Sequence, residues 1–173
     1  MKYFIYGCFA ILLIIIILAI IYFLLLIRLK GINKRIYRYK EENEIKDNNV
    51  LIVYQKSLHE TTYKIASLVK DTILNKGYGY SLHTLSKKID TFQDYKYVIL
   101  VMPVYFGEIN EMFINIVKNY KIKNLVIIYN GLNKESNNED KIVKNNSINK
   151  YKKIKVHTED INDVVSFIDK EVL

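Results

Sequence analysis

Residues 3–27 form an almost unbroken apolar run, and a different hydrophobic pattern begins after residue 48. At a rise of about 1.5 Å per residue, a helix over this run is long enough to cross a bilayer core of about 30 Å. The run ends in basic residues rather than at a cleavage site with small side chains, which favours a retained membrane helix over a cleaved signal peptide. We predict a transmembrane helix at 1–30, a basic and polar juxtamembrane linker at 31–48, and one folded domain at 49–173.

Three short segments of the domain are continuously apolar and rich in β-branched residues, as is typical of strands buried on both faces of a parallel sheet. They are residues 49–54, 97–102 and 124–129. Residues 78–84 and 152–158 instead alternate between apolar and polar positions, with lysines in the latter, which suits strands at the edges of a sheet. The second and fifth strands are therefore the predicted edges, as in a doubly wound, five-stranded parallel sheet of order 2-1-3-4-5.

Amphipathic helices are predicted between these strands and after the last one. Apolar residues recur at helical spacing in 65–73, 109–120 and 161–172, so each of these segments has one face to bury. The link at 85–96 predicts one helical turn at most. Residues 133–150 are rich in Asn and Lys and predict either a poor helix or a mobile loop. The chain is thus expected to be an α/β protein preceded by a single membrane helix.

The net charge of +8 is unevenly distributed along the chain. Residues 1–40 contain seven basic and no acidic residues, whereas residues 41–173 contain 19 basic and 18 acidic residues. The nearly neutral domain does not support nucleic acid as a partner. Because basic flanks of membrane helices stay in the cytoplasm, we expect the N-terminus outside the cell membrane and the domain in the cytoplasm, with the basic flank on anionic lipid.

Cysteine usage and motifs narrow the chemistry further. The single cysteine, Cys8, lies in the apolar run, so the domain has neither disulfides nor thiolate metal sites. No residue pattern demands a catalytic role, and none predicts a metal site.

Ligands of open parallel sheets bind beyond the carboxyl ends of the strands, near the point where the strand order reverses. Three segments of this chain lie at such ends. They are "SLHETT" at 57–62, "PVYFG" at 103–107, which holds the only proline, and "NG" at 130–131. A strand-to-helix turn whose aromatic residues pack on the sheet is the plain structural alternative for "PVYFG".

The first of these segments resembles the phosphate loop of flavodoxins and flavodoxin-like oxidoreductases. In that loop a strand ending in an aromatic residue, here Tyr54, is followed by a hydroxyl-rich turn, by a threonine at a helix start and by an alanine four residues later. Ser57, Thr62, Ala66 and Val69 match this pattern. "PVYFG" resembles the loop that covers the flavin ring in flavodoxin-fold reductases and in menaquinone-dependent protoporphyrinogen oxidases.

The resemblance implies a flavodoxin-like fold, a flavin cofactor and a role in electron transfer or flavin-dependent oxidation and reduction. FMN is the expected form, because the chain offers one phosphate loop and no second dinucleotide fingerprint. Tyr105 is expected to stack on the ring or contact its rim, Gly107 to allow close backbone approach, and Pro103 to stiffen the turn. The implied cofactor-binding residues are Ser57, Leu58, His59, Glu60, Thr61, Thr62, Pro103, Val104, Tyr105, Phe106, Gly107, Asn130 and Gly131.

Two departures from the flavodoxin pattern leave a second hypothesis open. Glu60 stands where the family usually has a glycine, and one residue is added between Tyr54 and Ser57. A carboxylate beside a phosphate dianion is repulsive, although Glu60 can equally be an ordinary acidic residue at the start of a helix. The chain is therefore either a tethered flavoprotein whose partners are a quinone or a redox protein, or a membrane-anchored interaction module that has lost its cofactor.

Overall fold

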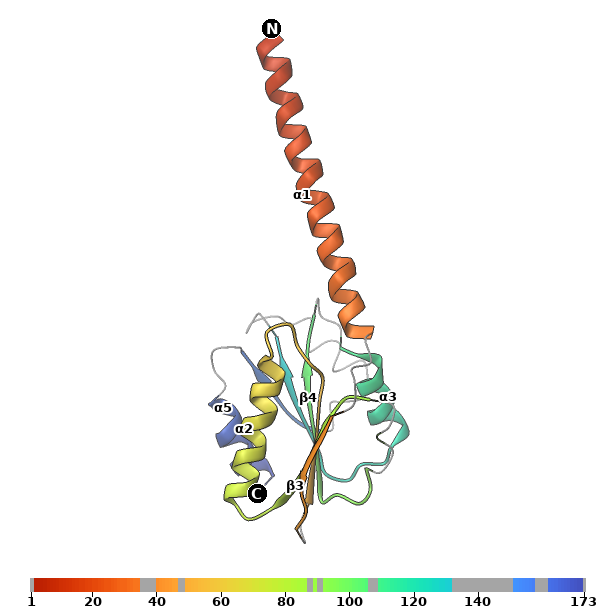
Figure 1. Cartoon of the computed structure of the whole chain (residues 1–173), viewed down its shortest axis with the longest axis vertical. Helices are drawn as coiled ribbons and strands as arrows, with labels where there is room; N and C mark the ends of the chain where they lie inside the picture. Colours follow the sequence, from red (N-terminus) through yellow and green to blue (C-terminus); the bar gives the residue numbers. More distant parts are fainter. Residues whose placement is uncertain are drawn as a thin grey trace. The chain divides into compact units, whose positions relative to one another are not determined.

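The computed structural model describes residues 2–34, 40–46, 49–86, 89, 92–105, 109–131, 151–157 and 162–172. The chain divides into two compact units, Met1–Arg35 and Ile36–Leu173 (Figure 1). The first unit is the helix α1 (Lys2–Lys34). Its segment Phe9–Arg28 has a mean hydropathy of 3.5 and is not buried. Helix α1 is long and apolar enough to cross a membrane. A signal sequence near an N-terminus can have the same length and composition.

The second unit is built on a mostly parallel sheet. All five predicted strands are present, and they lie in the predicted order relative to one another. Across the sheet, the five parallel strands lie in the order β3, β2, β4, β5, β6, and each pairs with its neighbour in parallel. Their bounds are β2 (Asn49–Tyr54), β3 (Gly79–Thr84), β4 (Tyr97–Pro103), β5 (Leu125–Asn130) and β6 (Lys152–Val156).

The sheet has six strands rather than the predicted five. Strand β1 (Glu41–Glu44) pairs antiparallel with β3, with Glu41 opposite His83. The prediction that β3 is an edge strand was therefore wrong. The domain's first strand lies in the range assigned to the linker, and its sequence, "EENE", is exposed throughout. Hydrophobic patterning cannot detect such a strand, because it buries no apolar side chain.

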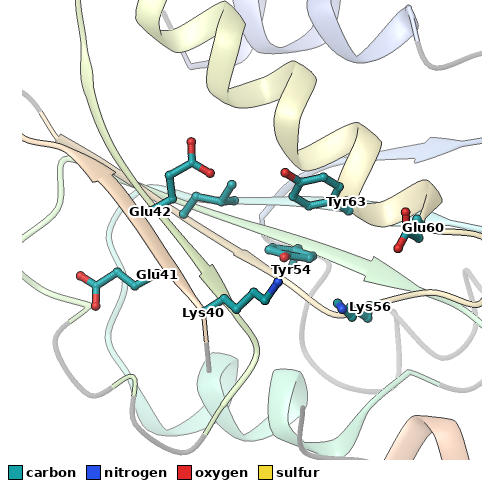
Figure 2. A pocket seen from close by; sticks show the side chains of 8 residues that line it. Lys40, Glu41, Glu42, Tyr54, Lys56, Glu60 and Tyr63 are labelled. Atoms are coloured by element: carbon teal, nitrogen blue, oxygen red, sulfur yellow. The ribbon is translucent and has the colours of Figure 1, made fainter. Parts of the chain in front are cut away.

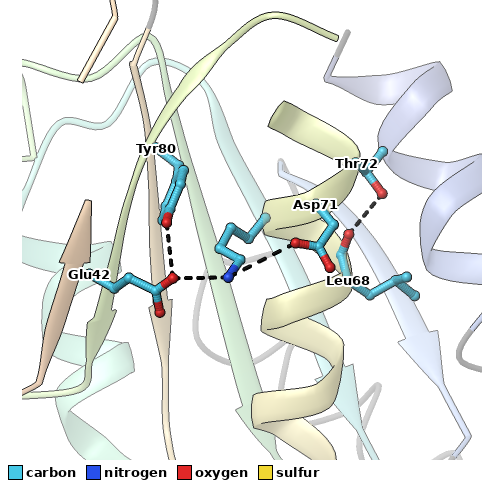
Figure 3. Close-up of polar contacts among 6 residues, drawn as sticks. Glu42, Leu68, Asp71, Thr72 and Tyr80 are labelled. Atoms are coloured by element: carbon cyan, nitrogen blue, oxygen red, sulfur yellow. Dashed lines mark hydrogen bonds and ion pairs between the residues drawn. The ribbon is translucent and has the colours of Figure 1, made fainter. Parts of the chain in front are cut away.

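Polar contacts hold β1 in place. The Glu42 carboxylate accepts hydrogen bonds from Lys70 on α2 and from the Tyr80 hydroxyl on β3, each at 2.9 Å (Figure 3). These contacts lower the pKa of Glu42 and raise that of Lys70. Gly79 makes room for the strand, since a Cβ there would lie 2.7 Å from the Glu44 carbonyl oxygen.

Helices cover both faces of the sheet (Figure 1). The helices α2 (Thr61–Asn75) and α5 (Asp163–Glu171) pack on one face, where Ile65, Ile73 and Ile168 are fully buried. The helix α3 (Glu111–Asn119) covers the other face and buries Phe113 completely. Each of the three predicted amphipathic helices is present among the described residues. The predicted poor helix or loop at 133–150 lies outside the described residues.

Burial of His83 on β3 makes the domain acid-sensitive. The residue is 7% exposed, and burial lowers the pKa of its imidazole below the usual 6.5, although the Glu41 carboxylate 3.9 Å away acts in the opposite sense. As the pH falls below about 6.5, the unfolded chain takes up a proton that the folded chain resists. The free energy of unfolding should therefore fall with pH over this window.

Urea unfolding of the full chain in nonionic detergent at several pH values between about 5 and 7.5 measures this loss. The His83→Gln variant should show a shallower dependence on pH, because it has no imidazole to protonate. Glu42, whose pKa is lowered, contributes stability that is lost only below about pH 4.5 and so does not interfere. An unchanged slope in His83→Gln would contradict this prediction.

Candidate functional site

The carboxyl ends of the parallel strands are joined to one another by backbone hydrogen bonds. The Gln55 amide donates to the Val101 carbonyl at 3.1 Å, and the Val104 amide donates to the Asn130 carbonyl at 2.8 Å. The three predicted ligand loops thus begin side by side at one edge of the sheet. This is the edge at which open parallel sheets bind ligands.

The loop between β2 and α2 closes through internal hydrogen bonds. The Thr62 amide donates to the Ser57 hydroxyl at 3.2 Å, which fixes the first turn of α2. The Thr62 hydroxyl points inward and donates to the Gln55 carbonyl, and both residues are fully buried. Thr62 therefore shapes the loop, and its hydroxyl is engaged within the protein.

Glu60 has a left-handed backbone conformation, which glycine adopts easily. This accounts for the glycine that the flavodoxin pattern has at this position. Glu60 precedes α2 with φ of 56° and ψ of 12°, and it is the one non-glycine residue with positive φ among the described residues. A left-handed conformation costs a residue with a Cβ roughly 1–2 kcal/mol, a cost that glycine avoids. The Glu60 side chain makes no hydrogen bond that caps the helix, so capping does not account for the glutamate.

Two backbone amides of the loop remain open for an anion. Within the described part of the chain, the amides of His59 and Thr61 make no hydrogen bond. They lie at the positive end of the α2 dipole, and the Ser57 hydroxyl is nearby in the same loop. Such a helix start suits a phosphate group. The exposed Glu60 carboxylate is the feature that opposes one.

Tyr105 joins the second loop to the first. Its hydroxyl accepts a hydrogen bond of 3.0 Å from the Leu58 amide. The sequence predicted that Tyr105 stacks on the flavin ring or contacts its rim, and the structure adds a polar contact between its hydroxyl and the backbone of the loop between β2 and α2. The two loops are therefore linked by this hydrogen bond.

Removing this link should loosen the first loop. The Tyr105→Phe variant keeps the ring but removes the hydroxyl that accepts the Leu58 hydrogen bond. Such a hydrogen bond contributes about 0.5–1.5 kcal/mol. We expect the Leu58 amide to exchange with solvent about threefold to tenfold faster, as measured by hydrogen exchange. Amides of the buried strand β4 serve as the reference and should be unaffected. Unchanged exchange at Leu58 would show that the contact does not constrain the loop.

The remaining predicted site residues differ in their surroundings. Pro103 is the last residue of β4 and pairs in register with Asn130. The Val104 side chain packs in the core on the α3 face, and the Asn130 amide group donates to the Val156 carbonyl at 3.1 Å. Val104 and Asn130 can thus offer a ligand mainly their backbones. Gly131 is buried, and Phe106 and Gly107 lie outside the described residues.

A cavity that the sequence did not reveal adjoins the loop between β2 and α2. It has a volume of about 310 Å³ and opens on the α2 face of the sheet beside β1 (Figure 2). We call it the β1 cavity, and its walls include Lys40, Glu42, Tyr54, Lys56, Glu60 and Tyr63. Sequence reasoning missed it because Lys40 and Glu42 come from the segment expected to be a linker. No group of three His, Cys, Asp or Glu side chains in the described residues could hold a metal ion.

The fold is shared with known flavoproteins, although the sequence is not. No family model and no curated protein matches the chain. A candidate flavoprotein from Bacteroides eggerthii aligns with a TM-score of 0.55 at 11% identity, over 73% of this chain and 99% of that one. A short-chain flavodoxin associated with a non-canonical PDU bacterial microcompartment aligns with a TM-score of 0.51 at 16% identity, over 72% and 97%. The prediction of a flavodoxin-like fold is confirmed at the level of architecture.

Proposed function

We propose that the chain is a membrane-tethered flavodoxin-like protein that binds FMN and acts in electron transfer or as a flavin-dependent oxidoreductase. The observation that carries this proposal is the loop before α2. It combines a left-handed residue at position 60 with open amides at His59 and Thr61, at the carboxyl edge of a flavodoxin-like sheet. These are the features that a phosphate requires of a helix start.

In this proposal each loop has a separate task. The amides of His59 and Thr61 and the Ser57 hydroxyl hold the phosphate of FMN. The loops at 103–107 and 130–131 cover the ring, and Tyr105 keeps the first two loops together. FMN supplies the redox chemistry when it is bound, and the protein positions it and limits its contact with water.

Membrane tethering completes the proposed function. With α1 across the cell membrane and its basic flank inside, the domain lies in the cytoplasm. A tethered domain meets membrane quinones or membrane-bound redox proteins at a raised effective concentration. A quinone- or porphyrinogen-linked oxidase is the narrower form of the proposal, and it rests on the resemblance of "PVYFG" alone.

Flavin titration of the full chain in nonionic detergent tests this proposal. FMN fluorescence should be quenched on binding, and the purified protein should be yellow. Riboflavin, which lacks the phosphate, is the matched control and should bind at least about tenfold more weakly if the amides of the loop hold the phosphate, a difference of about 1.4 kcal/mol. A colourless protein that takes up neither flavin would overturn the proposal.

A cofactor-free interaction module is the second candidate, and the internal hydrogen bonds of the loop favour it. Leu58 and Thr62 are among the implied cofactor-binding residues, but the Leu58 amide and the Thr62 hydroxyl are engaged within the protein. The Glu60 carboxylate makes no ion pair in the described part of the chain. This candidate predicts that flavin binding stays absent even after Glu60 is replaced by glycine.

A further inference from the structure

The β1 cavity is lined by two lysines, Lys40 and Lys56, and by three glutamates, Glu41, Glu42 and Glu60. The Glu42 carboxylate is already compensated by Lys70 at 2.9 Å. Figure 2 shows the Glu41 carboxylate turned away from Tyr54, and it lies 3.9 Å from His83. Among the described residues, neither Lys40 nor Lys56 forms an ion pair with an acidic side chain. Lys40 and Lys56 therefore keep hydrogen-bond donors that an anionic ligand can use.

Tyr54 adds an open hydrogen-bond donor to this cavity. The residue is 4% exposed, yet its hydroxyl makes no hydrogen bond to any residue that the structure describes. Burial raises the pKa of this hydroxyl to about 12, so it remains protonated at neutral pH. Buried tyrosine hydroxyls usually have a partner. The Tyr54 and Tyr63 rings lie with their centroids 5.5 Å apart and form an aromatic wall.

We propose that the β1 cavity binds the phosphodiester headgroup of an anionic membrane lipid. The ammonium groups of Lys40 and Lys56 and the Tyr54 hydroxyl are the donors, and the phosphodiester oxygens are acceptors only. The cavity is distinct from the flavin-phosphate loop, because Lys40 and Lys56 act through side chains on the β1 side rather than through amides at the start of α2.

Exposed apolar side chains beside the cavity suit a lipid better than free phosphate. Leu58, in the loop between Lys56 and Glu60, is 46% exposed, and Tyr63 is 39% exposed. Both can contact the glycerol and upper acyl groups of a lipid. Free phosphate would make no use of them.

Chain connectivity supports the same ligand. Lys40 is bonded to Thr84 through two hydrogen bonds, at 2.8 and 3.1 Å, which fixes it at the carboxyl edge of β3. In the sequence, Lys40 follows Lys34, the last residue of α1, by six positions. This step rests on the proposed membrane anchorage, because a tethered domain meets lipid headgroups at a raised effective concentration.

Native mass spectrometry of the full chain in nonionic detergent tests the proposal, with phosphatidylglycerol as the probe. We expect Lys40→Gln and Lys56→Gln each to raise the apparent Kd for the first bound lipid about fivefold to tenfold, because each removes a charge-assisted hydrogen bond. Tyr54→Phe, which removes only the hydroxyl, should raise it about threefold. Lys123→Gln removes the same charge from an exposed lysine before β5 and should change the Kd less than twofold.

The possible results separate the alternatives. Equal weakening by Lys123→Gln and Lys40→Gln would overturn the proposal, because binding would then follow net charge. Displacement of the lipid by inorganic phosphate at concentrations near the lipid's own Kd would overturn the lipid assignment in favour of free phosphate. Lys40→Gln should leave FMN affinity unchanged. Lipid binding that depends on Lys40 in a chain that binds no flavin would support this proposal while refuting the proposed function.

Discussion

Replacement of Thr62 by valine should lower the free energy of unfolding by about 1–3 kcal/mol, because the buried Gln55 carbonyl would lose its donor. Valine is close to threonine in shape, so the loss reports the hydrogen bond rather than a change in volume. The same bond holds the loop that carries the open amides of His59 and Thr61. FMN affinity should therefore fall together with stability. Urea unfolding and flavin titration of the full chain measure the two effects.

Thr61 provides a matched control at the neighbouring position. It is 5% exposed, and its side chain makes no hydrogen bond within the described part of the chain. Thr61→Val should therefore change stability by less than about 0.5 kcal/mol. If both variants lose the same stability, the cost comes from placing valine in the first turn of α2, and the Thr62 hydroxyl has no special role.

The Glu60→Gly variant should bind FMN about fivefold to tenfold more tightly. The substitution removes a carboxylate next to the proposed phosphate position, where two charges about 4 Å apart in water repel by about 1 kcal/mol, and it relieves the left-handed conformation of a residue with a Cβ. Stability should change little, since glycine also gains entropy in the unfolded chain. Flavin titration at low and high salt checks the electrostatic part, which should weaken as salt is added.

Glu60→Gln separates charge from backbone conformation. It removes the carboxylate but keeps the Cβ. Glu60→Gln should therefore show the salt-dependent part of the gain in FMN affinity, but not the part that comes from relieving the left-handed conformation. Two unchanged affinities would place the phosphate away from this loop. A gain in Glu60→Gly alone would show that backbone geometry, rather than repulsion, limits binding.

Hydrophobic pattern was sufficient to predict the centre of the fold. The strands β2, β4 and β5 are buried on both faces, so the continuous apolar runs predicted at 49–54, 97–102 and 124–129 identify them without further information. Helical spacing likewise identified the side chains that α2 and α3 bury. The strand order followed because alternating strands belong nearer the edges than continuous ones.

The hydrophobic pattern predicted neither the strand β1 nor the burial of His83. One physical reason accounts for both. Strand β1 buries no apolar side chain and is held by hydrogen bonds to β3 and by the Glu42 contacts, so its sequence resembles a solvated linker. His83 is buried partly because β1 covers β3, a neighbour that its local sequence does not reveal. Long-range polar contacts leave no periodic trace in the chain.

For the candidate site, the sequence by itself determined which loops meet and that Glu60 departs from the flavodoxin pattern. Strand order fixes which carboxyl ends are neighbours, and the residue types at those ends are readable directly. Only the tertiary structure decided that position 60 is left-handed, that the Thr62 hydroxyl turns inward, that Tyr105 reaches Leu58, and that Lys40 and Tyr54 share a cavity. Each of these depends on the direction of a side chain or a peptide group, which packing against distant residues sets and local sequence does not.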